Sequence, residues 1–197
     1  MHFEKGNLYH VYNMGNNRQK IFFSDENYLF FLRKIRTIVK PACEILAYCL
    51  MPNHFHFMLM ATEKSEVYVN KSGLQILSRK IGTMQSSYTQ AINKEKGTVG
   101  SLFRQKTKAK NLRQVIDFPN RNDDYALTCF DYIHYNPINA GLVVGAEEWK
   151  YSSYSDYIGL RNGSLINKSL AFEVLGIEDD YYVDFSYNGN QNIDEIF

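Results

Sequence analysis

The sequence predicts an α+β fold in which helices cover one face of an antiparallel sheet. Short segments alternate between apolar and polar residues, as strands do, and two longer segments repeat apolar residues at helical spacing. The third observation is the order of these segments, which is strand, helix, strand, strand, helix, strand. This is the order of a split βαβ motif.

The first half of the chain supplies a strand, a helix and a hairpin. Residues 8–14 alternate and are followed by Gly-Asn-Asn, which predicts a strand that ends in a turn. Apolar residues at helical spacing predict a helix over 24–40, which Pro41 stops. Residues 44–50 and 54–60 are two further apolar strands, and the short turn between them predicts an antiparallel hairpin.

The second half supplies a second helix, a fourth strand and a further helix. A helix is predicted over 74–93, where Gly97 follows the apolar pattern. Residues 103–112 alternate with lysines on one face and complete a ferredoxin-like order. A helix over about 123–135 is stopped by the Asn-Pro pair that follows it. Smaller closing elements are predicted over 140–144, 149–157 and 168–175.

Length and charge predict one compact domain, residues 1–160, followed by a C-terminal extension, residues 161–197, that is acidic and partly flexible. From Glu173 onward the chain has seven acidic residues and no basic one, so this end would not approach a polyanion. The segment from Lys71 to Arg113 has ten basic residues and one acidic residue, which predicts a surface that faces phosphates. No apolar run is long enough for a bilayer, so we expect a cytoplasmic, nucleoid-associated protein of bacterial type without a membrane partner.

His54 and His56 are the first candidates for chemistry. Side chains alternate in a strand, so these two imidazoles project from the same face and can chelate a divalent cation. Two ligands are too few for a metal site, and a third must come from elsewhere in the fold. The other interpretation is a pair of half-buried strand histidines that are hydrogen-bonded to backbone carbonyls.

Tyr132 and Asn136 are the second pair of candidates. They are four residues apart on the predicted helix over 123–135, which places them one turn apart on the same face. If this face packs beside the two histidines, the amide oxygen of Asn136 can complete the metal site while Tyr132 points at a bound phosphate. The sequence then predicts a phosphotransfer site, although Tyr132 alone could equally be a core or surface aromatic residue.

Five segments resemble a known family. Residues 51–57, Met-Pro-Asn-His-Phe-His-Phe, resemble the HUH motif (His, hydrophobic, His) of single-tyrosine transposases that act on single-stranded DNA. Residues 132–143, Tyr-Ile-His-Tyr-Asn-Pro-Ile-Asn-Ala-Gly-Leu-Val, resemble the branch called REP-associated tyrosine transposases. Segments 9–18, 102–105 and 149–153 are also similar to that branch.

The resemblance implies a fold, an activity and a set of roles. It implies a ferredoxin-like sheet with the histidines on a central strand and the nucleophile on a C-terminal helix. His54 and His56 would bind Mg²⁺ or Mn²⁺ with Asn136 as third ligand, and Tyr132 would form a 5′-phosphotyrosine. The implied substrate is single-stranded DNA, often beside hairpin-forming repeats. Related enzymes include dimers, and the sequence leaves a homodimer and a monomer open.

Phosphate contacts are predicted from the basic residues near these elements. The candidates are Arg18, Arg79, Lys80, Arg104, Lys106 and Lys108. Met14, Asn139 and Tyr151 differ from the residues that the branch often carries, which leaves the phosphate contacts and the preferred hairpin open.

Two other functions remain open at this point. The same element order is used by non-catalytic modules that bind single-stranded nucleic acid. A metal-dependent hydrolase could also use the two histidines, but it would need a carboxylate that the sequence does not place beside them. The product separates the three functions, because the transposase-type enzyme leaves a covalent protein–DNA adduct, the hydrolase leaves none, and the module leaves the DNA intact.

Overall fold

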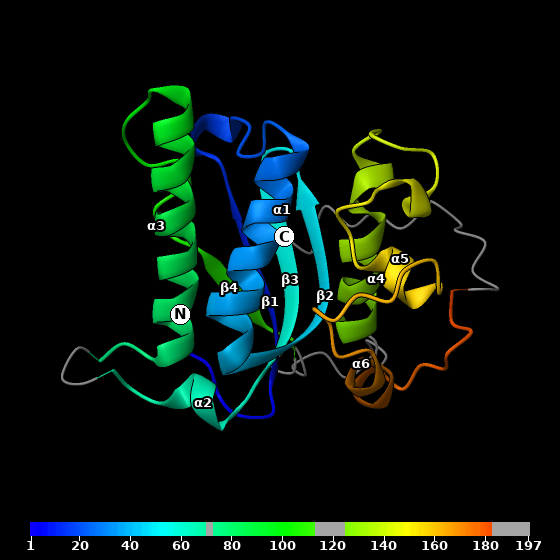
Figure 1. Cartoon of the computed structure of the whole chain (residues 1–197). Helices are drawn as coiled ribbons and strands as arrows, with labels where there is room; N and C mark the ends of the chain where they lie inside the picture. Colours follow the sequence, from blue (N-terminus) through cyan, green and yellow to red (C-terminus); the bar gives the residue numbers. More distant parts are fainter. Residues whose placement is uncertain (70–72, 113–124, 183–197) are drawn as a thin grey trace.

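A computed structural model of the chain describes residues 1–69, 73–112 and 125–182. It has a four-stranded antiparallel sheet in the order β2-β3-β1-β4 (Figure 1). The predicted α+β class with an antiparallel sheet is therefore confirmed. The strands are β1 (Leu8–Met14), β2 (Cys43–Met51), β3 (His54–Ala61) and β4 (Lys108–Asn111).

The first helix is α1 (Asp25–Lys34), and the side chain of Ser24 accepts a hydrogen bond from the backbone N–H of Asn27 at its start. The helical path continues through a π-turn (Ile35–Val39) into a 3-10 turn (Lys40–Ala42). Pro41 lies inside that last turn, so the predicted end of the helix is correct to within two residues. A short helix, α2 (Glu63–Glu66), follows the hairpin.

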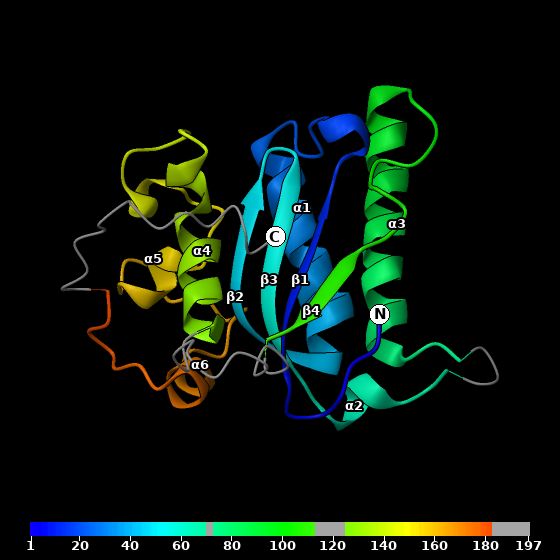
Figure 2. The same cartoon turned by 180° about the vertical axis from the view of Figure 1, so that it is seen from behind.

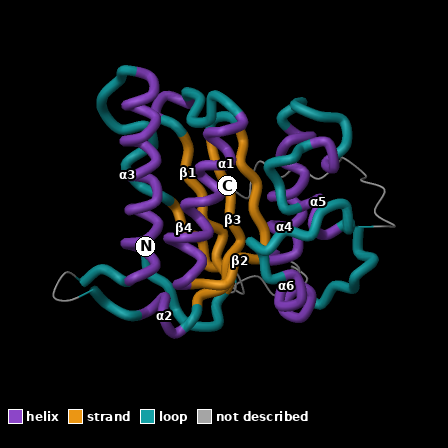
Figure 3. The backbone as a smooth tube through the Cα atoms, viewed as in Figure 1, coloured by secondary structure: helices purple, strands orange, loops and turns teal. Residues whose placement is uncertain are grey.

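The second long helix, α3 (Ile76–Lys96), ends where Gly97 adopts the left-handed conformation at φ 65°. Together α1 and α3 cover one face of the sheet (Figures 1 and 3). The core between them is aromatic, with the rings of Phe31 and Phe55 5.4 Å apart and those of Phe31 and Tyr88 4.9 Å apart. In the described part of the chain, no helix is long and apolar enough to cross a membrane.

The predicted strand over 103–112 is wrong in its first half. Phe103 forms only an isolated bridge with Gly15, and β4 begins at Lys108. The amide of Asn13 explains the interruption, because it donates hydrogen bonds to the carbonyl of Arg104 (3.1 Å) and the hydroxyl of Thr107 (3.0 Å). These bonds replace the strand ladder over the intervening residues.

The third helix, α4 (Tyr125–Asn139), runs past the point at which the sequence predicted its end. Pro137 lies inside it, and the helix stops only where Gly141 turns left-handed at φ 65°. The backbone N–H groups of Gly141 and Leu142 donate to the carbonyls of Ile138 (2.8 Å) and Pro137 (2.9 Å), which is a Schellman ending. The proline removes one hydrogen bond without ending the helix. The predicted start near residue 123 lies outside the described residues.

The prediction that helices cover one face holds for α1 and α3 but is wrong for α4. Tyr132 of α4 contacts His56, whose side chain projects from the face opposite to that of Phe55. Figures 1 and 2 both show α4 beside β2, away from α3. The sheet therefore has helices on both faces, and among the described residues α4 covers the second face near β2 and β3.

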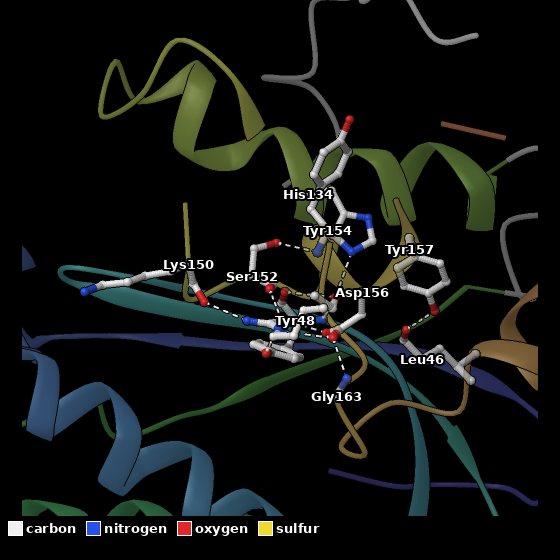
Figure 4. Close-up of polar contacts among 11 residues, drawn as sticks. Leu46, Tyr48, His134, Lys150, Ser152, Tyr154, Asp156, Tyr157 and Gly163 are labelled. Carbon is white, nitrogen blue, oxygen red and sulfur yellow. Dashed lines mark hydrogen bonds and ion pairs between the residues drawn. The ribbon is translucent and has the colours of Figure 1, made fainter. Parts of the chain in front are cut away.

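The segment after α4 folds back onto β2. It contains η5 (Ala146–Glu148), α5 (Tyr154–Tyr157) and α6 (Lys168–Leu175). Asp156 accepts hydrogen bonds from the guanidinium of Arg161 (2.8 and 2.6 Å) and from the N–H of Gly163 (2.8 Å), and Arg161 also donates to the hydroxyl of Tyr48 in β2 at 2.9 Å (Figure 4). This partly buried ion pair, with its hydrogen bond to Tyr48, connects the C-terminal segment to the sheet edge.

Candidate active site

His54 and His56 lie on β3, which is a central strand of the sheet. Their rings are 4.8 Å apart at 88°, and both project from the face that α4 partly covers. His56 is 4% exposed, whereas His54 is half-buried at the start of the strand. Strand alternation thus places two imidazoles next to each other with one of them open to solvent.

Tyr132 and Asn136 approach these histidines from α4. Asn136 Oδ1 lies 3.1 Å from His54 Nε2, and the Tyr132 ring lies 5.4 Å from the His56 ring at 85°. The helix reaches this position because it continues past Pro137 and remains packed against β2 and β3. Four of the residues singled out from the sequence are therefore neighbours, although they come from elements about 80 positions apart.

A third histidine, which the sequence analysis did not single out, completes the cluster. His10 of β1 is fully buried, and its Nε2 lies 2.8 Å from Nδ1 of His56. Its ring stacks on those of Tyr12 (4.7 Å) and His56 (5.0 Å). The signal was present, because His10 and Tyr12 are two residues apart on a predicted strand and so share a face.

His54 contacts more hydrogen-bond acceptors than it has N–H groups. Its Nδ1 lies 2.6 Å from Asn53 Oδ1, and its Nε2 faces Asn136 Oδ1. Both partners are carbonyl oxygens, and a neutral imidazole has one N–H. The Asn53 amide is oriented by its Nδ2, which donates to the carbonyl of Arg18 at 3.3 Å. A neutral His54 can donate to only one of these oxygens: the contact with Asn53 is the shorter one and favours a hydrogen on Nδ1, whereas a hydrogen bond to Asn136 raises the pKa of His54.

A divalent cation fits this arrangement. Two cis ligands of an octahedral Mg²⁺ ion lie about 3 Å apart, close to the separation of His54 Nε2 and Asn136 Oδ1. His56 Nε2 is buried without a hydrogen-bond partner among the described residues, as expected of a nitrogen whose lone pair binds a metal ion. No group of three His, Cys, Asp or Glu residues suited to a metal occurs in the described ranges, and the oxygen beside the two histidines is that of the Asn136 amide.

Burial controls the protonation of these groups. It lowers the pKa of His54, and it lowers the pKa of His56 further, with His10 and His54 adding to the effect. Neutral imidazoles are the form that binds metals. Burial raises the pKa of Tyr132, and a hydrogen bond from the Asn136 side chain partly offsets this. A neutral amide can lower the pKa of a phenol only by donating its N–H, so the Asn136 oxygen remains directed at His54.

The basic candidates are divided between the two faces. Lys108 is opposite Tyr12, which is opposite His56, so these three side chains share the histidine face. Arg104 and Lys106 line a polar groove between α3 and the segment before β4. Arg79 and Lys80 lie near the start of α3, on the other face. The strand register thus places Lys108 on the histidine face, although Lys108 also lines the groove beside α3, and Arg79 and Lys80 lie on the other face.

Arg18 lies in a tight loop beside the hairpin that carries His54. Asn17 and Arg18 adopt positive φ angles of 51° and 59°, which cost free energy in non-glycine residues. Gly15 permits the turn, because a Cβ atom there would come within 2.2 Å of the carbonyl oxygen of Gln19. The strained loop presents the Arg18 carbonyl to Asn53, and the Arg18 side chain remains exposed.

Comparisons with known proteins concern the chain as a whole and its fold. No protein-family model matches the chain. Over 159 residues it is 26% identical to a predicted REP-associated tyrosine transposase of Haemophilus influenzae. This alignment covers 77% of this chain and 82% of the relative. The chain is a homologue of a REP-associated tyrosine transposase. A solved structure of a REP-associated tyrosine transposase bound to a REP hairpin shares its fold, with a TM-score of 0.60 and 17% identity over 81% of this chain and 83% of that one. The predicted resemblance to the REP-associated tyrosine transposases is confirmed.

Proposed function

We propose that the protein is a transposase-type, metal-dependent endonuclease and strand transferase that acts on single-stranded DNA. The observation that carries this proposal is the approach of Tyr132 and Asn136, on α4, to His54 and His56, on β3. A nucleophile and three neutral ligands at one point are what cleavage through a phosphotyrosine requires.

The ligand set for the metal would be His54 Nε2, His56 Nε2 and Asn136 Oδ1. A bound Mg²⁺ or Mn²⁺ ion polarises the scissile phosphate and neutralises charge on the leaving oxygen, which is worth several kcal/mol. The protein's own contribution is to hold both imidazoles neutral through burial and to direct the Asn136 oxygen at His54. Among the residues that the structure describes, no carboxylate contacts His54 or His56, which argues against a hydrolase built on the same histidines.

Tyr132 would carry the covalent step. Its phenol oxygen forms a bond to phosphorus, the bond from phosphorus to the 3′-oxygen breaks, and the phenol proton passes to solvent while the 3′-oxygen leaves as a hydroxyl. The Asn136 N–H stabilises the phenolate as this proton leaves. In the second step a free 3′-hydroxyl attacks the phosphotyrosine and releases Tyr132. Rejoining therefore needs no nucleotide cofactor, because the phosphodiester energy is retained in the adduct.

The proposed substrate is DNA with a hairpin beside a single-stranded segment. A solved structure of the same fold holds a REP hairpin, and this chain presents Lys108 on the histidine face with Arg104 and Lys106 on the adjacent segment. Lysine and arginine bind the phosphate backbone without regard to base sequence. We propose these three residues and Arg18 as phosphate contacts close to the site, and Arg79 and Lys80 as more distant ones.

The test is to incubate the protein with a labelled single-stranded hairpin DNA from its flanking genomic repeats and Mn²⁺, followed by denaturing electrophoresis. We expect a slowly migrating covalent band that disappears with a chelator and in Tyr132→Phe. Tyr157→Phe is the matched control, because that hydroxyl donates to the carbonyl of Leu46 within the core and lies away from the histidines.

Two outcomes would contradict the proposal. Cleavage without an adduct, or cleavage that persists in Tyr132→Phe, would indicate a hydrolase. Tight DNA binding with neither cleavage nor adduct would indicate a binding module.

A further inference from the structure

Both candidate ligand histidines use Nδ1 for a contact within the protein. His54 Nδ1 lies 2.6 Å from Asn53 Oδ1, and His56 Nδ1 lies 2.8 Å from His10 Nε2. The two contacts differ in kind, because an amide oxygen only accepts hydrogen bonds, whereas an imidazole nitrogen can donate or accept. Asn53 therefore favours a hydrogen on Nδ1 of His54, while the tautomer of His56 depends on His10.

Only one tautomer of His56 leaves a lone pair for a cation. If Nδ1 carries the hydrogen and donates it to His10, Nε2 is free to bind a metal. If His10 donates instead, Nε2 of His56 carries a hydrogen and cannot bind one. Nε2 of His56 is buried and has no hydrogen-bond partner among the described residues. When His56 donates, the hydrogen of His10 lies on its own Nδ1, which is also buried, so burial alone does not select a tautomer. A cation at Nε2 of His56, in contrast, requires the lone pair there.

We propose that His10 is a positioning residue that accepts the Nδ1 hydrogen of His56 and thereby directs the lone pair of His56 Nε2 at the divalent cation. The inference rests on the proposed function, since it assigns a role within that metal site. His10 is fully buried, so water does not compete for the hydrogen bond. Its ring is nearly parallel to that of His56 (18°) and also stacks on the ring of Tyr12. These two contacts restrict rotation of the His10 imidazole.

Each candidate ligand histidine thus has a supporting residue that orients it and does not touch the metal. Asn53, in the hairpin turn, orients His54, and His10, on β1, orients His56. Partners of this kind hold metal ligands in the productive orientation, and their loss commonly weakens metal affinity by about 10- to 100-fold. His10 would therefore contribute to metal binding without touching the metal.

The first experiment measures the tautomers directly in the wild-type protein. Long-range ¹H–¹⁵N spectra of the full chain, labelled at histidine and free of metal, distinguish a protonated Nδ1 from a protonated Nε2. We expect His54 and His56 both to carry the hydrogen on Nδ1. A hydrogen on Nε2 of His56 would overturn the proposal, whatever the protein does with metal.

The second experiment measures Mn²⁺ affinity by electron paramagnetic resonance of the free ion. We expect His10→Leu to bind Mn²⁺ about 10- to 100-fold more weakly than wild type. His10→Gln should recover most of this loss, because its amide oxygen can accept the same hydrogen. Tyr88→Phe, which removes a core hydrogen bond to the Ile21 carbonyl on the other face, is the matched control for destabilisation.

Equal Mn²⁺ affinity in His10→Leu and wild type would overturn the role of His10. If the wild type itself bound no Mn²⁺, the proposed metal site would be wrong, and the tautomer spectrum would still decide whether His10 orients His56. A His10→Leu variant that does not fold leaves that spectrum and His10→Gln to decide. The failure of the inference and the failure of the proposed function are thus separate results.

Discussion

Two buried histidines, His56 in the sheet and His134 in α4, are alike in burial but differ in their partners. His56 is 4% exposed and His134 is not exposed, and burial lowers the pKa of each below its usual value. His134 lies 2.7 Å from the hydroxyl of Ser153 through Nε2 and 2.7 Å from that of Tyr182 through Nδ1. The hydroxyl of Tyr182 donates its hydrogen to Asp131 and so accepts from Nδ1 of His134. The hydroxyl of Ser153 can donate to Nε2, so both nitrogens of a neutral His134 are satisfied. His56 has such a partner at Nδ1 alone.

The difference separates a structural histidine from a candidate ligand. The hydroxyl of Ser153 also receives a hydrogen bond from the N–H of Tyr48 in β2, and the hydroxyl of Tyr182 donates to Asp131. His134 thus connects α4 to the sheet and to the C-terminal segment, and this holds Tyr132 and Asn136 over the histidine face. Residue type and burial do not distinguish the two roles, whereas the set of hydrogen-bond partners does.

The largest expected effect is on chemistry and comes from His56→Ala. We expect Mn²⁺ binding and adduct formation to fall below detection, because one of three ligands is lost. His134→Ala is the matched control, and at a temperature where it remains folded it should form the adduct at a rate close to wild type. Loss of the adduct in folded His134→Ala, with retention in His56→Ala, would reverse the assignment of the two residues.

The second expected effect is a pH dependence of the free energy of unfolding, to which all the buried histidines contribute in the same direction. Burial lowers the pKa of both His10 and His134 to about 3, and it lowers that of His56 well below its usual value. An unfolded chain takes up these protons near pH 6.5, whereas the folded protein does not, so stability is complete above pH 6.5 and is lost as the pH falls towards 3.

As the pH falls from 6.5 to 5, protonation of each of these histidines in the unfolded chain should lower the free energy of unfolding by about 2 kcal/mol. Urea unfolding of the metal-free protein at both pH values measures this. His10→Leu and His134→Ala should each have a smaller pH dependence than wild type. A wild-type stability that does not change over this range would mean that these histidines are not neutral in the folded protein.

The third expected effect is a difference between His134 and His56 in the stability that each contributes at pH 7. His134→Ala removes two buried hydrogen bonds and leaves a cavity beside Phe130, whose ring is 4.5 Å from that of His134. We expect the free energy of unfolding to fall by about 2–4 kcal/mol at pH 7, measured by urea unfolding. His56→Ala should cost less when no metal is present, because its Nε2 has no hydrogen bond to lose. A larger cost for His56→Ala would mean that its role is structural.

Much of this fold could be predicted from the sequence because its strands and helices are strongly periodic. The strand over 8–14 has the predicted bounds, the closing element over 168–175 also has them and is a helix, and the hairpin differs by one residue at three of its four ends. The failures occurred where non-local contacts decide. The Asn13 amide interrupts the strand over 103–112, and packing against β2 places α4 on the second face of the sheet.

The site shows the same limit. Alternation in a strand and the four-residue spacing in a helix were enough to select His54, His56, Tyr132 and Asn136 as candidates. Alternation places His10 on the same face as Tyr12, but its contact with His56 joins strands that are 46 residues apart in sequence and could not be predicted. The hydrogen-bond partners that distinguish His56 from His134 are likewise non-local, and no role was assigned to His134 from the sequence.

The smallest expected effect tests whether DNA lies on the histidine face. Lys108 shares that face with His56, whereas the exposed Arg33 lies on α1, which covers the other face. We expect Lys108→Ala, in a Tyr132→Phe background that prevents covalent capture, to weaken binding of the hairpin DNA modestly. One lost phosphate contact should reduce the slope of log affinity against log salt by about 0.7 on a single strand. Fluorescence anisotropy at several salt concentrations measures this slope, and Arg33→Ala should leave it unchanged. If Arg33→Ala reduced the slope and Lys108→Ala did not, the DNA would lie across α1, away from His54 and His56, and the proposed role of His56 would lose its substrate.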